Sequence, residues 1–200
     1  MSTTTATTRR VEVGSRITAR ELATVGGESA PLPDPDQLVH LQLRRFAGCP
    51  VCNLHLQSIA RRHDEIEQAG VREVVVFHSS VDDLRPHVAD LPFPVVPDPD
   101  KALYRELGVE SSPRALLDPR AWPSIVRGIA ASTWLILRRR GRAPSLDPEG
   151  GRFGLPADLL VAPDGRVLAV KYGVHAADQW SVDELLDLAA IATAPNAEPR

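Results

Sequence analysis

The stretch "LVHLQLRRFAGCPVCNLHL" (38–56) decides the fold, because its pattern of apolar residues changes at two cysteines. Apolar and polar residues alternate over 38–46, and this period of two predicts a β-strand. After Cys49 and Cys52, apolar residues recur at three- and four-residue steps. That spacing predicts an amphipathic helix, which we expect to end at Gly70. Both cysteines of the 200-residue chain are therefore expected where a strand passes into a helix.

The segments that follow continue this alternation of strand and helix patterns. An apolar run over 72–80 predicts a strand that is buried on both faces. Helix, strand and helix patterns then lead to Gly108, which is typical of a parallel α/β sheet. Residues 155–173 predict an antiparallel hairpin, and the last helix opens with a capping box of Ser181 and Glu184. We expect a central mixed sheet that is flanked by helices.

One segment, 111–153, interrupts this order with an apolar helical pattern followed by the basic run "RRRGR" (138–142). We interpret it as a helical and loop insertion, whose apolar side covers either the active site or a dimer interface. We divide the chain into a disordered tail (1–11), one domain (12–193) and a second disordered tail (194–200).

Charge and composition exclude several classes of protein. The net charge of −3 does not favour nucleic acid as a partner. No run reaches the roughly 20 apolar residues of a membrane span, so we expect no membrane partner. The N-terminal segment lacks the apolar core of a secretory signal, which favours a cytoplasmic protein. Thiols stay reduced there, so paired cysteines indicate catalysis or metal binding more often than a structural disulfide.

The position of the cysteine pair favours redox chemistry. Unpaired N–H groups and the dipole at a helix N-terminus stabilise a thiolate. Pro50 suits the first helical position, and Arg44 and Arg45, which precede the motif, add positive potential near the pair. The two-residue spacing lets one sulfur attack and the other resolve the product. We favour Cys49 as the nucleophile and Cys52 as the resolving thiol, and the opposite assignment, in which Cys52 attacks from the first helical turn, stays open.

Two other interpretations of the pair were weighed. A structural zinc site needs four ligands, and the candidates Cys49, Cys52, His55 and His63 extend over about three helical turns. Alternatively, the cysteines are ordinary buried small residues, which leaves their place between strand and helix unexplained. A redox pair fits the α/β context best.

The residues together resemble the peroxiredoxin-like branch of the alkyl hydroperoxide reductase/thiol-specific antioxidant superfamily. The resemblance is carried by "FAGCPVCNLHL", "REVVVFHSS", "DKALYRELGV", "LPADLLVAPDGRVLAVKYG" and "DQWSVDELLDLA". It implies a thioredoxin-like fold and a thiol-dependent antioxidant or disulfide oxidoreductase, with Cys49 and Cys52 as its redox pair. It also implies that Pro156, ahead of the penultimate strand, lies against the pair and positions substrate, often after a cis peptide bond. The other interpretation of Pro156 is a proline that merely begins a strand.

The resemblance further implies a hydroperoxide or disulfide substrate, a thioredoxin-like or small-thiol reductant, no metal, flavin or nucleotide cofactor, and a possible homodimer. However, the peroxiredoxin motif Pro-x-x-x-Thr-x-x-Cys fits neither cysteine. The family's thiolate-stabilising arginine could be Arg114, Arg127 or Arg152. A redox sensor without turnover, or an enzyme acting on a non-peroxide substrate, therefore stays open beside the peroxidase.

Overall fold

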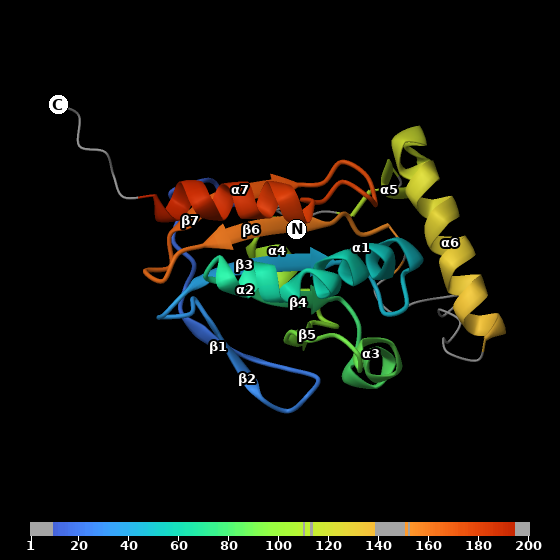
Figure 1. Ribbon diagram of the computed structural model, residues 1–200, viewed down its shortest axis with the longest axis horizontal. Coiled ribbons are helices and arrows are strands. Elements are labelled where there is room, and N and C mark those ends of the chain that lie inside the picture. The colour runs from blue at the N-terminus through green and yellow to red at the C-terminus, as the bar shows by residue number, and fades with distance from the viewer. Residues whose placement is uncertain (1–9, 110, 113, 139–150, 152, 195–200) are drawn as a thin grey trace, which may run out of the picture.

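The centre of the molecule is a five-stranded mixed sheet with strand order β5-β4-β3-β6-β7 (Figure 1). The computed structural model describes residues 10–109, 111–112, 114–138, 151 and 153–194. β3, β4 and β5 run parallel, whereas β6 is antiparallel to β3 and β7 is antiparallel to β6. The strands are β3 (Leu38–Arg44), β4 (Val71–Phe77), β5 (Val95–Pro97), β6 (Ala157–Val161) and β7 (Val167–Tyr172). This is the thioredoxin-like arrangement expected from the sequence.

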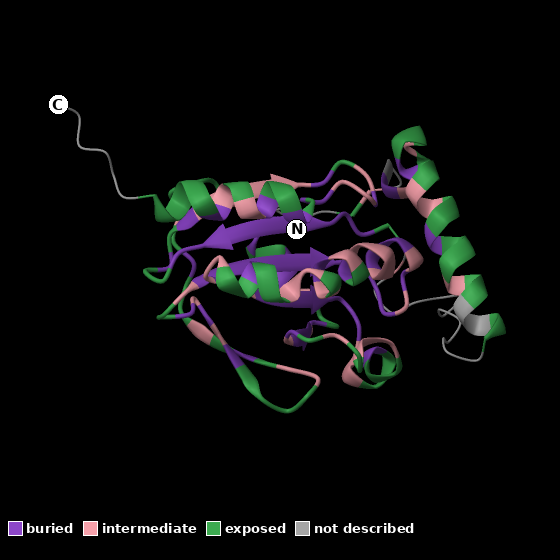
Figure 2. Ribbon diagram, in the orientation of Figure 1, coloured by how far each residue is buried: buried purple, intermediate pink, exposed green. Residues whose placement is uncertain are grey.

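Helices cover both faces of the sheet and bury its central strands completely (Figure 2). On one face, apolar side chains of α1, α2 and α7 pack against the sheet, and on the other face those of α4 do so. α3 lies beside β5. The helices are α1 (Pro50–Arg61), α2 (His63–Gln68), α3 (Val81–Val88), α4 (Ala102–Glu106) and α7 (Val182–Thr193).

Two details differ from the sequence prediction. The helix expected as far as Gly70 is divided at Arg62, whose φ of −117° and ψ of 22° end α1 before α2 begins. The second detail is β2 (Ser29–Leu32), for which we predicted no strand and which pairs with β1 (Arg20–Ala23) in a separate hairpin. The prolines hide this short strand from a pattern search.

The insertion forms α5 (Arg114–Leu117), a 3₁₀ turn (Pro119–Ala121) and α6 (Trp122–Leu137), which stands across one end of the sheet (Figure 1). Its ends are joined where Ser111 pairs with Gly154. Most of the basic run, the outer part of both expected tails and Arg152 lie outside the described residues. Within the described part of the chain, every helix is too short or too polar to cross a bilayer.

Candidate active site at the start of helix α1

Cys49 is the N-cap of α1, directly after the turn that leaves β3. Its sulfur accepts a hydrogen bond from the Cys52 backbone N–H at 3.5 Å, and Pro50 occupies the first helical position. Gly48 makes the turn possible, because its φ is +72° and a Cβ there would lie 2.8 Å from the His87 ring. The local sequence thus fixes Cys49 at the helix start and places Cys52 in the first turn.

The two sulfurs face each other. Cys52 donates its thiol hydrogen to Cys49 across a distance of 2.9 Å between the Sγ atoms. Both residues are free cysteines, and each is only 1% exposed. We call this pair the dithiol. A disulfide between these sulfurs requires an approach of less than 1 Å from their present separation.

Arg45 supplies positive charge to the dithiol. Its Nη1 donates to Cys49 Sγ at 3.6 Å, and its guanidinium also lies 5.2 Å from the centroid of the Phe46 ring. Burial by itself raises the pKa of the Cys49 thiol. The hydrogen bond from Cys52, the charge of Arg45 and nearby backbone N–H groups more than offset burial and lower that pKa to about 6. Cys49 is therefore mostly a thiolate at neutral pH.

Cys52 has the opposite character. Burial raises the pKa of its thiol well above the ordinary value, and the hydrogen bond to Cys49 and the negative charge on that residue act in the same direction. One sulfur is thus ionised and the other keeps its proton. Such a pair has an attacking group and a proton-bearing partner within contact distance.

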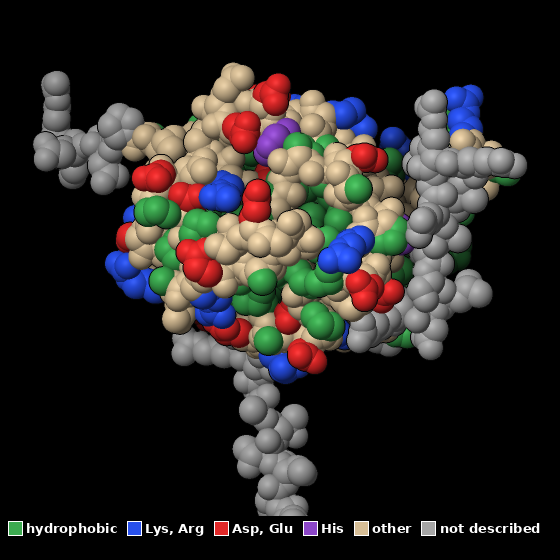
Figure 3. Space-filling view, turned by 90° about the horizontal axis from the view of Figure 1, so that it is seen from below, with side chains coloured by type: hydrophobic (Ala, Val, Ile, Leu, Met, Phe, Trp, Pro, Cys, Tyr) green, Lys and Arg blue, Asp and Glu red, His purple; other side chains and the backbone are tan. Residues whose placement is uncertain are grey.

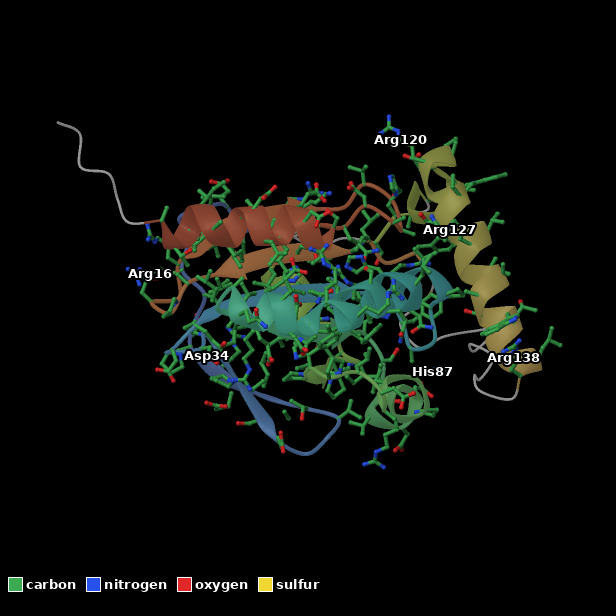
Figure 4. The ribbon with its side chains drawn as sticks, viewed as in Figure 1. Arg16, Asp34, His87, Arg120, Arg127 and Arg138 are labelled. Carbon is green, nitrogen blue, oxygen red and sulfur yellow. The ribbon has the colours of Figure 1, made fainter. Side chains whose placement is uncertain are left out.

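A cavity of about 140 Å³ opens at the dithiol, and both cysteines line it. Its wall combines Phe77 and Leu56 with the polar side chains of Asn53 and Ser132. His87 of α3, seen in Figure 4 beside the loop that precedes α1, also belongs to the lining. The cavity could hold a small molecule with one apolar and one polar end.

α6 closes the other side of the helix start. Gly128 lies so close to α1 that an added Cβ would be 2.8 Å from the Pro50 carbonyl oxygen. Ser132 of the insertion also lines the dithiol cavity, so α6 forms part of its wall.

A buried ionic network lies on the sheet face beneath α1 and α7. Its members are His40, Gln42, Arg44, Glu73 and Asp158, all from the three central strands and all 0% exposed. His40 Nδ1 contacts Glu73 at 2.9 Å, its Nε2 contacts Asp158 at 3.1 Å, and Arg44 Nη2 donates to Asp158 at 2.6 Å. Gln42 donates to Glu73. Two cations and two carboxylates thus compensate one another out of contact with water.

The charges of this network determine which of its groups are ionised. Burial alone lowers the pKa of His40, but the charge of Glu73 and the hydrogen bond that the imidazole donates to Asp158 raise it to about 9, so the imidazole is protonated. Burial raises the pKa of Asp158, but the charge of Arg44 and the bond to His40 keep it well below its usual range. Burial and the charge of Arg44 lower the pKa of His55 to about 3. Neutral His55 therefore accepts a hydrogen bond from Arg44 at 3.2 Å, which links the network to α1.

Among the residues singled out from the sequence, Cys49, Cys52 and Arg45 lie together, and Pro50 begins α1 as predicted. Pro156 directly precedes β6, and its ring packs against Gly173. Pro156 is not part of the lining found for the dithiol cavity. Among the described peptide bonds only Leu32–Pro33 is cis, so the bond before Pro156 is trans.

Among the described side chains, the arginine that reaches the thiolate is Arg45, which precedes the cysteines. Arg127 lines a separate cavity with Val51 and His55, and Arg152 lies outside the described residues. Sequence reasoning also missed His87 and the ionic network. The polar residues 40, 42 and 44 between apolar neighbours were the available signal, but the same alternation describes a strand with one solvated face.

Comparisons with known proteins place this geometry in context. In fold, the chain is similar to peroxidoxin BcpB from Mycobacterium tuberculosis (TM-score 0.62, 15% identity, 91% of this chain and 98% of that chain). It is also similar to peroxiredoxin 6 of Arenicola marina (TM-score 0.65, 14% identity, 91% and 74%). A third similar fold is that of a Chlorobium tepidum protein assigned as the thiol:disulfide interchange protein DsbE (TM-score 0.57, 17% identity, 90% and 98%). No curated protein matches the chain.

A family model provides the assignment that these distant similarities do not. The model described as "AhpC/TSA antioxidant enzyme" matches residues 58–175, more than half of the chain, and the match begins after Cys52. The fold of β3 to α7, described above, is the one that this family shares with the peroxiredoxins of known structure. On this basis the chain belongs to the AhpC/TSA antioxidant enzyme family.

Proposed function

We propose that the protein is a thiol peroxidase in which Cys49 attacks a small hydroperoxide and Cys52 resolves the product. The observation that carries this proposal is the asymmetry of the dithiol. Cys49 Sγ lies 3.6 Å from the Arg45 guanidinium and has a pKa of about 6, whereas Cys52 keeps its proton 2.9 Å away. An ionised nucleophile beside a protonated thiol is the arrangement that a two-cysteine cycle needs.

The cycle has three steps. The Cys49 thiolate attacks the terminal peroxide oxygen, the O–O bond breaks, and the departing alkoxide takes a proton, giving an alcohol and a Cys49 sulfenic acid. The Cys52 sulfur then attacks the sulfenic sulfur, water leaves with the Cys52 proton, and a Cys49–Cys52 disulfide forms. A dithiol reductant of the thioredoxin type, or two small thiols, returns two electrons and two protons and becomes oxidised itself.

Disulfide exchange is the second candidate function. It is supported by the similarity in fold to the protein assigned as DsbE and by the closeness of the two free thiols. The burial of both sulfurs favours the peroxidase, because the 140 Å³ cavity admits a small peroxide directly, whereas a folded protein disulfide, like a thioredoxin-type reductant, requires the site to open.

The test compares the reduced wild type with Cys49→Ser and Cys52→Ser. We expect wild type to lose both free thiols after one equivalent of hydroperoxide and to continue turnover when a dithiol is added. Cys52→Ser should stop at a sulfenic acid that dimedone traps on Cys49, whereas Cys49→Ser should be inert. Reduction of insulin without peroxide consumption would favour disulfide exchange. A single oxidation without turnover would indicate a redox sensor, and either result would refute the peroxidase.

A further inference from the structure

α6 presents a row of large apolar side chains to solvent. Trp122 is 59% exposed and Trp134 is 50% exposed, although tryptophan is among the residues that folded proteins bury most. We call the following set the outer face of α6: Trp122, Val126, Ile129, Trp134 and Leu137. Trp122, Val126 and Ile129 recur at steps of four and three residues, and Leu137 lies about three turns after Val126, so these four residues share one side of the helix. This side is not explained by the fold of the chain.

Other residues of α6 hold the helix against the domain. Gly128 contacts the start of α1, Ile125 packs against the main core, and Ser132 lines the dithiol cavity. Ile129 borders this packed side, and the rest of the outer face is directed away from the active site. Of the two roles considered for the apolar side of the insertion, covering the dithiol belongs to the inner face, and the outer face still lacks a partner among the described residues.

The charges beside the outer face all have one sign. Arg120 and Arg138 lie before and after α6 (Figure 4), whereas Arg127 lines the cavity that α6 forms with Val51 and His55. Residues 119–138 contain no Asp or Glu. Arg138 lies 3.9 Å over the Trp134 ring. In contrast, the face of the molecule seen in Figure 3 mixes acidic and basic side chains.

We propose that the outer face of α6 docks on an anionic lipid surface, with the helix axis parallel to the membrane plane. Interfacial helices combine a Trp- and Leu-rich face with basic residues that reach lipid phosphates, and this is the composition found here. Trp122 and Trp134 lie about 18 Å apart along the axis, so both ends of the helix reach the headgroup region together. The 16 residues of α6 are too few to span a bilayer, and the helix therefore lies on the surface.

A second copy of this chain fits the outer face less well. Pairing two α6 helices through these side chains would bring Arg120 and Arg138 of each copy to the same interface, with no carboxylate on either helix to compensate them. An anionic lipid surface offers acyl chains to the apolar side chains and phosphate groups to the arginines. The expectation of no membrane partner came from the absence of a long apolar run, which says nothing about helices that lie on a surface. Docking is also independent of the proposed peroxidase chemistry.

The test measures sedimentation of the reduced full-length protein with vesicles. One set of vesicles contains equal parts of phosphatidylglycerol and phosphatidylcholine, and the other contains phosphatidylcholine alone. We expect binding to the anionic vesicles only, with a loss on raising the salt concentration. Trp fluorescence should shift to the blue on binding, since Trp122 and Trp134 are exposed whereas Trp180 is already buried.

The double variant Val126→Glu/Ile129→Glu tests the apolar contact, and we expect its partition coefficient to fall by at least about tenfold. Ile191→Glu is the matched control, because Ile191 is a 74% exposed apolar residue on α7, away from the insertion. Arg120→Gln should weaken binding by roughly fivefold.

Three results would overturn the proposal: no binding to either vesicle, equal binding to both, or equal loss in Ile191→Glu. Light scattering that shows a dimer, abolished by Val126→Glu/Ile129→Glu, would assign the outer face to a second copy instead. Circular dichroism of each variant separates loss of binding from loss of fold. A protein that turns over peroxide but does not bind vesicles would contradict the docking proposal and would still support the proposed function.

Discussion

Replacing Arg45 with Gln tests the electrostatic origin of the Cys49 thiolate. For unit charges 3.6 Å apart, Coulomb's law at an effective dielectric constant of about 20 gives roughly 4–5 kcal/mol, or about three pKa units. Relaxation of the surroundings reduces this figure, and we expect the pKa of Cys49 to rise from about 6 to about 8 or higher. The thiolate fraction at pH 7 should then fall from about nine tenths to one tenth or less.

The assay is the pH profile of thiolate absorbance and of iodoacetamide alkylation, with mass spectrometry assigning the modified residue. The midpoint of the profile is the readout, because a rate at one pH mixes the thiolate fraction with nucleophilicity, which rises with pKa. Arg45→Lys keeps the charge and should hold the midpoint closer to that of wild type. Arg127→Gln removes an arginine that lines a different cavity and should change nothing. A midpoint still near 6 in Arg45→Gln, or an equal shift in both Arg45 variants, would refute the reasoning.

Three further predictions concern stability and access. The pKa of His40 in the folded protein is raised to about 9. Protonation of His40 therefore contributes fully to the free energy of unfolding below about pH 6.5, and this contribution of about 3 kcal/mol is lost as the pH rises toward 9. Urea unfolding of Cys49→Ser should show this fall in the free energy of unfolding with rising pH, because the substitution removes the opposite effect of the lowered Cys49 pKa. Adding His40→Gln should make the free energy of unfolding nearly independent of pH over this range. Asp158→Asn should cost about 3–5 kcal/mol by leaving buried cations uncompensated, whereas Asp164→Asn in an exposed turn should stay within about 0.5 kcal/mol; equal losses would contradict the network. Gly128→Ala should displace α6 and so speed the reaction of the dithiol with an aromatic disulfide reagent in the folded protein. In an unobstructed helix alanine would instead raise the stability. A slower reaction together with greater stability would therefore contradict the contact between Gly128 and α1.

Local patterns were sufficient to predict the frame of the site. The change of period at Cys49, the C-x-x-C spacing and Pro50 each act within a few residues, so the strand, the turn and the helix start follow from them. The capping box at Ser181 was likewise predicted and is present in full. Arg45 could be proposed from its distance in sequence to the cysteines, because the turn brings it back onto Cys49.

Features that depend on tertiary contacts could not be predicted in this way. In the sequence, the alternation around His40 and Arg44 is typical of a strand with one solvated face. In the structure both side chains contact Asp158, which belongs to a strand more than 100 residues away. His87 reaches the site only because Gly48 leaves room for its ring. Periodicity showed that α6 is a helix, but it did not show which side faces solvent, since that depends on the fit between Gly128 and α1.

The cap that Cys49 provides for α1 has a consequence for the energetics of oxidation. A thiolate accepts the helix N–H groups and the charge of Arg45, whereas a sulfur in a disulfide is neutral and loses most of that stabilisation. The disulfide is thereby destabilised relative to the dithiol, and the reduction potential of the pair moves toward oxidising values. In the proposed cycle, the groups that ionise Cys49 for attack on a peroxide therefore also make the resulting disulfide easier to reduce.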